Sequence, residues 1–195
     1  MPRRVVILFA RAPRLGAVKR RLARGIGDRA ALRFYTATLA ATARPIARDR
    51  RWTTVLATTP RFARADWARF VPRGTARAGQ PHGDLGRRME RALRPFRVAV
   101  LAGSDIPGLR PADIAAAFRA LGRADAVFGP AADGGYWLIG MGPRRPARPF
   151  AGVRWSSPQA LADTLRNFRG RRVAFLRTLR DVDTAEDLAM LGPGA

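Results

Sequence analysis

The segment "RVVILFARAPRLGAVKRRL", residues 4–22, joins an apolar run to a short loop and then to a basic stretch with helical spacing. Residues 4–10 are apolar at nearly every position, which is typical of a central parallel strand that is buried on both faces. Pro13 and Gly16 mark the loop, and residues 17–24 form the first predicted helix. This order of strand, loop and helix predicts an α/β domain.

The same alternation continues along the chain. Further strands are predicted at residues 53–59, 97–103, 125–131, 136–141 and 172–176. Further helices are predicted at residues 28–48, 61–69, 84–94, 111–121, 157–168 and 184–191. Asp28, Pro111 and Thr184 stand where a helix start places a cap or first-turn residue. We predict a single domain over residues 1–195, with three α/β/α layers and a mostly parallel, mixed sheet.

The composition is strongly basic, with 37 Lys plus Arg, 14 Asp plus Glu and a formal net charge of +23. Clustered cations bind nucleic acid by neutralising phosphates, but here the arginines are dispersed along the chain. No zinc-finger, zipper, RNP or KH signature accompanies them. We therefore expect a solvated cationic surface and no specific nucleic-acid partner.

Cysteine is absent from the sequence, which excludes disulfides and thiolate metal sites. No apolar run approaches the roughly 18 residues that a membrane span requires, and the N-terminal apolar stretch is too short for a signal peptide. We expect a cytoplasmic protein without a membrane span.

Lys19 is the only lysine of the chain. An ammonium is a compact point charge, whereas a guanidinium is a wide planar fork, so a lone lysine suggests a specific role at this position. The alternative is a chance survivor of codon composition, because arginine has become the default cation of this chain. The loop before the predicted helix can bind phosphate through its backbone N–H groups, or it can be an ordinary turn with surface cations. It matches neither the P-loop nor the dinucleotide fingerprint, because Gly16 stands alone.

Several of the scarce acidic residues follow predicted strands, at the edge where ligands bind in such sheets. Asp105 ends a buried strand, so its carboxylate requires a metal, a cation or a backbone-capping role. Asp133, followed by two glycines, is typical of a hairpin turn. Asp181 and Asp183 precede a predicted helix, so one of them can be its N-cap. The lone His82 is interpreted as a loop residue.

Six ordered segments together resemble the DUF2064 family of bacterial proteins, whose members are described as glycosyltransferases and linked in name to arsenosugar biosynthesis. The segments are "FARAPRLGAVKRRL", "QPHGDLGRRM", "GSDIPGL", "GPAADGGYWLIG", "VRWSS" and "DVDTAEDL". The resemblance extends from about residue 4 to residue 191. It implies a Rossmann-like GT-A fold, similar to nucleotide-diphospho-sugar transferases and to the nucleotidyltransferases of molybdenum-cofactor and deazaflavin-cofactor synthesis. It also implies a nucleotide-diphosphate ligand and a divalent metal.

The resemblance assigns roles residue by residue. Asp105 becomes the leading metal ligand and a catalytic residue, and Asp183 becomes the second ligand. Mg²⁺ or Mn²⁺ fits best, because sites built from oxygen ligands suit hard cations. Lys19 would bind the diphosphate with help from Arg21, and Asp133 is a candidate general base on the sugar or acceptor side. The positions assigned to nucleotide and substrate binding are Ala10, Pro13, Gly16, Lys19, Arg21, Gln80, Gly83, Asp84, Ser104, Gly134, Gly135 and Tyr136.

One position departs from the family pattern P-x-x-G-x-V-K-T-R-L, because Arg20 replaces its threonine. If that hydroxyl contacts a phosphate in relatives, this chain must use an arginine contact or do without one.

Three functions remain open at this point. The first is metal-dependent sugar transfer from a nucleotide-sugar donor to a small-molecule acceptor. The second is nucleotidyl transfer from a nucleoside triphosphate to a phosphorylated small molecule. The third is a non-catalytic protein that binds anions or nucleic acid. The sequence leaves the base, the sugar, the acceptor and the oligomeric state undetermined.

Overall fold

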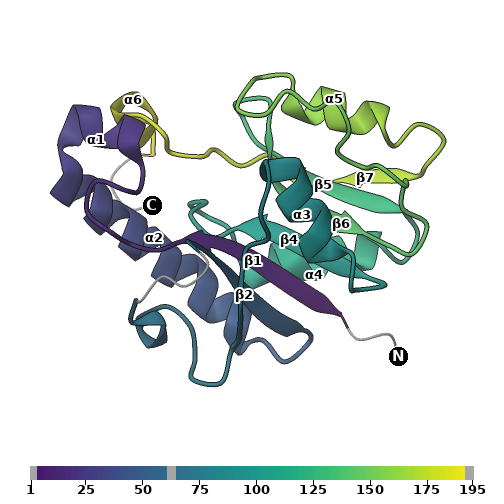
Figure 1. Ribbon diagram of the computed structural model, residues 1–195, viewed down its shortest axis with the longest axis horizontal. Helices are drawn as coiled ribbons and strands as arrows, with labels where there is room; N and C mark the ends of the chain where they lie inside the picture. Colours follow the sequence, from purple (N-terminus) through teal and green to yellow (C-terminus); the bar gives the residue numbers. More distant parts are fainter. Residues whose placement is uncertain (1–3, 61–64, 192–195) are drawn as a thin grey trace.

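The computed structural model describes residues 4–60 and 65–191, and its centre is one mixed β-sheet (Figure 1). Its strands are β1 (Val5–Arg11), β2 (Thr53–Thr59), β3 (Ala76–Gly79), β4 (Ala99–Gly103), β5 (Ala126–Pro130), β6 (Tyr136–Met141) and β7 (Val173–Phe175). They lie in the order β3-β2-β1-β4-β6-β5-β7. Strand β6 is antiparallel to β4 and β5, and every other pairing is parallel. The predicted mostly parallel, mixed sheet is confirmed.

Helices cover both faces of the sheet. They are α1 (Arg20–Ile26), α2 (Asp28–Arg48), α3 (Leu85–Leu93), α4 (Pro111–Ala120), α5 (Ala160–Arg166) and α6 (Ala185–Ala189). Strand β1 alternates between two cores, with Val6 and Leu8 facing α2 and α4. Val5 and Ile7 face the opposite core, to which α3 and α5 contribute. The three predicted α/β/α layers follow from this two-sided burial.

A third, smaller core lies beyond the carboxyl end of β1, where α1, α2 and α6 meet (Figure 1). Leu22 and Val182 are fully buried there. Gly25 allows α1 to approach α6 closely, because a Cβ at this position would lie 2.7 Å from the Ala185 Cβ. This contact brings the loop after β1 next to the segment before α6, although they are far apart in sequence.

The three residues predicted to mark helix starts do so in the structure. Thr184 is the N-cap of α6 and accepts a hydrogen bond from the Asp187 N–H, while the Asp187 carboxylate accepts one from the Thr184 N–H. Pro111 is the first residue of α4, and Asp28 is the first of α2. The helix termini were therefore readable from local side-chain chemistry.

Two predicted helices differ from the structure, and one strand was not predicted. Of the helix predicted at residues 61–69, residues 61–64 lie outside the described residues, and the described part forms a 3-10 turn, η1 (Trp67–Arg69), rather than an α-helix. One turn suffices to bury Trp67, and Pro72 prevents a longer helix nearby. Strand β3 was missed because its small and charged residues lack apolar alternation, and as an edge strand it pairs only with β2. Helix α1 begins at Arg20 rather than at residue 17, because Lys19 adopts a left-handed conformation.

Across residues 4–60 and 65–191, no helix combines the length and the apolarity that crossing a lipid bilayer requires.

Candidate active site

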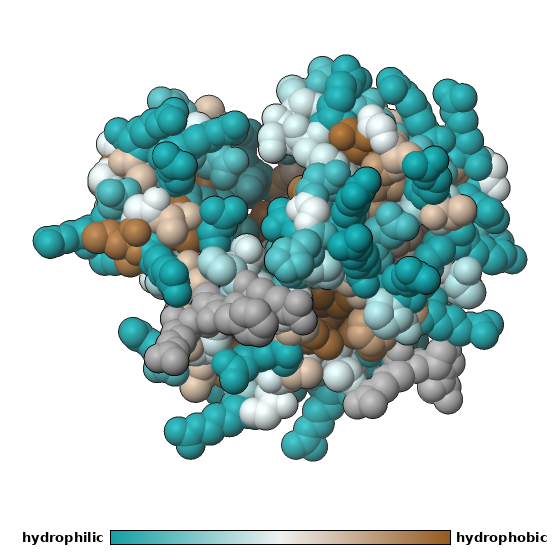
Figure 2. Space-filling model, in the orientation of Figure 1, coloured by the Kyte–Doolittle hydropathy of each residue, from teal (hydrophilic) through white to brown (hydrophobic). Residues whose placement is uncertain are grey.

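A cavity of about 410 Å³ lies at the carboxyl ends of β1, β2 and β4. Its lining includes Ala10, Arg11, Lys19, Arg20, Arg21, Tyr35, Gln80, Arg88, Asp105, Asp181 and Asp183. Figure 2 shows the surface hollowed between the part of the molecule that carries α1 and α6 and the part that carries α3 and α5. The cavity therefore lies at the edge of the sheet where the polar loops were predicted to meet.

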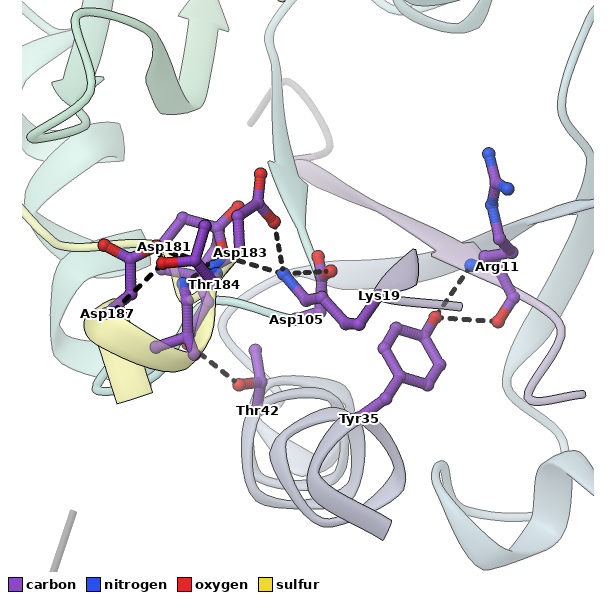
Figure 3. Close-up of polar contacts among 11 residues, drawn as sticks. Arg11, Lys19, Tyr35, Thr42, Asp105, Asp181, Asp183, Thr184 and Asp187 are labelled. Carbon is purple, nitrogen blue, oxygen red and sulfur yellow. Dashed lines mark hydrogen bonds and ion pairs between the residues drawn. The ribbon is translucent and has the colours of Figure 1, made fainter. Parts of the chain in front are cut away.

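Lys19 lines this cavity and contacts all three of its carboxylates. Its side chain is only 4% exposed, and its Nζ lies 2.9 Å from Asp105 Oδ2, 2.7 Å from Asp181 Oδ1 and 3.3 Å from Asp183 Oδ1 (Figure 3). The residue has φ 44° and ψ 48°, a left-handed conformation that is costly for a side chain with a Cβ. The fold holds this strained backbone and thereby aims the ammonium at three carboxylates from two distant segments.

Separate elements deliver these carboxylates. Asp105 follows β4, whereas Asp181 and Asp183 belong to the segment between β7 and α6. The Asp187 carboxylate accepts hydrogen bonds from the N–H groups of Asp183 and Thr184, which ties this segment to the start of α6. The interpretation of Asp181 or Asp183 as the helix N-cap is therefore wrong, since Thr184 has that role.

Burial and charge act against each other in this cluster. Burial acts to lower the pKa of Lys19, but the charges of Asp105 and Asp181 outweigh it and hold the pKa above its usual value. The pKa of Asp181 is raised to about 6, mainly by burial. The charge of Lys19 opposes this rise, and the charges of Asp105 and Asp183 add to it. One ammonium therefore compensates three carboxylates only in part.

Tyr35 of α2 lines the first cavity and contacts the end of β1. Its hydroxyl donates to the Arg11 carbonyl at 2.7 Å and accepts from the Arg11 N–H at 2.9 Å, which anchors the end of β1 (Figure 3). Burial and the charge of Asp105 raise the pKa of this hydroxyl, so it remains a hydrogen-bond donor. Ser104, beside Asp105, is fully buried and does not line the cavity.

Gln80 and Arg88 also line this cavity and are hydrogen-bonded to each other. The Gln80 amide nitrogen donates to the carbonyls of Ala10 at 3.2 Å and Ala57 at 3.1 Å, which leaves its oxygen to accept from Arg88 Nη1 at 3.0 Å. The Arg88 Nε is buried and has no partner among the described residues. Burial and the nearby Arg11 lower the pKa of Arg88. Arg11 and Arg88 both line the first cavity, so this side of the cavity is positively charged.

A second cavity, of about 490 Å³, adjoins the first and shares Arg21, Asp181 and Asp183 with it. Its remaining lining is Leu85, Met89, Ile106, Ala131, Asp133, Gly135, Tyr136, Trp137, Trp155, Ser156, Ser157, Pro158 and Ala160. Asp133 Oδ1 accepts from the Gly135 N–H at 2.9 Å, so the expected turn between β5 and β6 is present. Gly134 has φ 84°, and a Cβ there would lie 2.1 Å from the Pro158 carbonyl oxygen. Only glycine fits at this position.

Most of the predicted site residues lie in these two cavities, but several do not. The residues Pro13, Gly16, Gly83, Asp84, Ser104 and Gly134 line neither cavity. Gly16 has φ 70° and shapes the loop before Lys19, while Asp84 caps α3 by accepting from the Arg87 N–H. Within residues 4–60 and 65–191, no three acidic, histidine or cysteine side chains are arranged to hold a metal ion as they stand.

Sequence reasoning missed Arg88, Arg11, Tyr35 and the contact of Asp181 with Lys19. Arg88 belongs to "QPHGDLGRRM" and Asp181 begins "DVDTAEDL", so both lie within segments that the sequence analysis singled out. The signal that would have separated them from their neighbours is burial, which the sequence does not display at isolated polar positions.

The geometry can be set beside known proteins. Residues 42–157 match the family described as "Uncharacterized protein conserved in bacteria (DUF2064)". The chain belongs to the DUF2064 family. No sequence among curated proteins matches it.

Solved structures share the fold of this DUF2064 protein. A "putative nucleotide-diphospho-sugar transferase" from Desulfovibrio desulfuricans G20 has a TM-score of 0.88 and 30% identity, over 99% of this chain and 87% of that chain. The Rv0371c protein of Mycobacterium tuberculosis H37Rv has a TM-score of 0.57 and 17% identity, over 97% of both chains. A cytidylyltransferase from Leptospira borgpetersenii has a TM-score of 0.58 and 14% identity, over 98% of this chain and 85% of that chain. The last two show the fold alone, and the predicted fold class is confirmed.

Proposed function

We propose that this DUF2064 protein is a glycosyltransferase that moves a sugar from a nucleotide-diphosphate donor to a small-molecule acceptor. The observation that carries the proposal is the pair of adjoining cavities that meet at Arg21, Asp181 and Asp183. A group-transfer reaction requires two substrates held side by side, and the cavities offer one position for each. The similarity to the Desulfovibrio protein, described as a "putative nucleotide-diphospho-sugar transferase", supports the same reaction class.

The first cavity suits the donor diphosphate. Its lining contains five cations, which are Arg11, Lys19, Arg20, Arg21 and Arg88. Charge-assisted hydrogen bonds from such groups to phosphate oxygens are about twice as strong as neutral ones. Arg20 lines this cavity, so an arginine contact is available where the family has a threonine. Gln80 holds Arg88 in place, which reduces the entropy lost when a ligand binds.

The donor atoms around Lys19 fit a hard divalent cation in kind. All three are carboxylate oxygens, the class of ligand that Mg²⁺ and Mn²⁺ prefer. All three oxygens contact the Lys19 Nζ at 2.7–3.3 Å, so an ion held by these carboxylates would share them with the ammonium. Asp105 and Asp183 are the residues proposed to hold Mg²⁺ or Mn²⁺. The ion would offset negative charge on the leaving nucleoside diphosphate.

The chain's own groups account for the remaining roles. Arg21 lines both cavities, so it is the residue proposed to stabilise the leaving diphosphate at the point of transfer. Asp133 is the proposed general base, because it lines the acceptor cavity and only its Oδ1 is engaged by a hydrogen bond within the described part of the chain. Its Oδ2 would take the proton of the acceptor hydroxyl.

Product analysis tests this proposal. Purified protein is first screened by thermal shift against nucleotides and nucleotide-sugars, with Mn²⁺ or with EDTA, and is then incubated with the stabilising donors and candidate acceptors. Release of a nucleoside diphosphate together with a glycosylated product supports sugar transfer. Release of pyrophosphate from a nucleoside triphosphate would instead identify a nucleotidyltransferase. Binding that depends steeply on salt, with no metal requirement and no turnover, would identify a non-catalytic anion-binding protein.

A further inference from the structure

The two cavities differ sharply in charge. The first has five cations and three carboxylates in its lining. The second has one cation, Arg21, and three carboxylates, Asp133, Asp181 and Asp183. This excess of acid occurs in a chain with 37 Lys plus Arg and only 14 Asp plus Glu. A cavity that concentrates acidic residues in so basic a protein discriminates against anionic ligands.

Lys19 does not remove this excess. Its ammonium binds Asp181 and Asp183 from the side of the first cavity and does not line the second. Asp133 makes no ion pair within the described ranges. Lys19 offsets only part of the charge of Asp181 and Asp183, and Asp133 is not offset by an ion pair, so a phosphate group in the second cavity would meet net like charge.

The uncharged part of the second cavity is aromatic and apolar. Tyr136 and Trp155 are partly buried and meet edge to face, with ring centroids 6.3 Å apart. Met89 and Ile106 add buried apolar surface beside them. Gly86 holds the indole closely, since a Cβ there would lie 2.9 Å from Trp155 Cζ2. The aromatic wall is thus rigid and offers a flat surface to a ring.

The residue after Trp155 carries backbone strain. Ser156 has φ 57°, a left-handed conformation that is uncommon for residues other than glycine. It is exposed and lines the same cavity. Strained residues of this kind cluster at ligand sites, where surrounding contacts hold them.

We propose that the second cavity selects an acceptor that has a flat apolar ring and no negative charge, and that it rejects phosphorylated acceptors. This inference rests on the proposed function, because it assigns the acceptor to the cavity beside the donor site. It favours sugar transfer over nucleotidyl transfer, since the latter requires a phosphorylated acceptor. A neutral alcohol and an amine-bearing ring both satisfy the charge requirement.

Three small probes of similar ring size test this selectivity. They are 4-methylphenol, which is neutral, tyramine, which is cationic, and phenyl phosphate, which is anionic. Binding is measured by saturation-transfer NMR on the full chain at constant ionic strength, with the parent and with the Trp155→Ala variant. We expect 4-methylphenol and tyramine to bind in a Trp155-dependent manner, with Kd values at least about tenfold lower than the Trp155-dependent Kd of phenyl phosphate.

Matched variants guard against a folding artefact. Trp155→Phe keeps a ring and should retain most of the binding, whereas Phe175→Ala removes an exposed aromatic that lines neither cavity and should leave binding unchanged. Asp133→Asn removes one negative charge and should narrow the gap between phenyl phosphate and 4-methylphenol. The inference is overturned if phenyl phosphate binds as tightly as 4-methylphenol in a Trp155-dependent manner, or if no probe shows Trp155-dependent binding.

The donor side is measured separately on the same samples. Binding of a nucleoside diphosphate is followed by calorimetry with the parent and with Trp155→Ala, and it should be similar in both. If the parent binds no nucleoside diphosphate but still discriminates among the three probes, the proposed function is refuted and the charge selectivity of the second cavity stands. Retained nucleotide binding without probe selectivity would refute only the acceptor inference.

Discussion

Two clusters of charged side chains in this protein have opposite balances of acid and base. At the junction of the cavities, the Lys19 ammonium is shared by three carboxylates. On α5, the Asp163 carboxylate has a side chain only 2% exposed and is bound by Arg154 at 2.8 and 2.9 Å and by Arg166 at 3.0 Å. The first cluster has too few cations for its acids, and the second has more than one cation for a single acid.

This difference separates a structural ion pair from a ligand site. The hydrogen bonds from Arg154 lower the pKa of Asp163 to about 2, so this carboxylate is satisfied by the protein alone. In the Lys19 cluster, burial and like charge raise the pKa of Asp181 to about 6. An acid-rich cluster that its own cation does not balance is where a further cation would be accommodated. The following predictions test whether the two clusters differ in this way.

The largest effect is expected at Lys19. The change Lys19→Ala should weaken binding of a nucleoside diphosphate by about 10- to 100-fold, or roughly 1.5–3 kcal/mol, because three carboxylates would then face the phosphates without compensation. Nucleoside binding should change little. Calorimetry with both ligands measures this. Lys19→Gly is the matched control, since glycine tolerates the left-handed φ of 44° and should show the same loss.

Lys19→Arg asks whether the lysine itself is required. The wider guanidinium should fit poorly among three carboxylates at a position that is 4% exposed, so nucleotide binding should fall. Binding and turnover equal to those of the parent would mean that the lone lysine is a remnant of codon composition, and the steric argument would fail.

The carboxylates come next. Asp105→Asn should preserve the fold but lower metal-dependent activity and metal-enhanced nucleotide binding at least about tenfold, equivalent to roughly 1.4 kcal/mol. Asp183→Asn should behave similarly, and the double variant should be little worse than either single variant because the two act as one unit. Activity assays with Mn²⁺ and with EDTA measure this. Asp163→Asn is the matched control and should retain the activity of the folded protein.

Replacing Asp163 should instead change the thermal stability of the protein. Its pKa is depressed in the folded protein, so its contribution is present above about pH 4 and is lost as the pH falls toward about 2. Asp163→Asn should lower the melting temperature by several degrees at pH 6, and this difference should shrink across that acidic range. Thermal denaturation of both proteins between pH 2 and pH 6 measures it. A difference that stays constant with pH would contradict the ion-pair account.

The smallest effect on nucleotide binding is expected at the basic surface. Arg48, Arg50 and Arg51 are exposed at and just after the end of α2 and line neither cavity. Replacing all three by Gln should reduce retention on heparin and change nucleotide affinity by less than about twofold, because solvent and salt screen charges at the surface. Parallel loss of both properties would show that surface and site are not separate.

Local patterns determined most of the fold. The six strands predicted from apolar runs are all present, because consecutive apolar residues such as those of β1 and β4 are characteristic of central strands. Thr184 and Pro111 were readable as helix starts from capping chemistry. Strand β3 was not predicted, because it lacks apolar alternation and its pairing to β2 depends on a neighbour distant in sequence.

The candidate site was determined only in part. The sequence by itself placed Lys19, Asp105 and Asp183 at loops on one edge of the sheet, because parallel strands send their carboxyl ends to the same side. The tertiary structure alone decided that one ammonium meets all three carboxylates, including Asp181, since these contacts join residues up to 164 positions apart. It also decided which loops form a basic cavity and which an acidic one. Burial and through-space distance set the energy of a charge, and neither is encoded in the order of neighbouring residues.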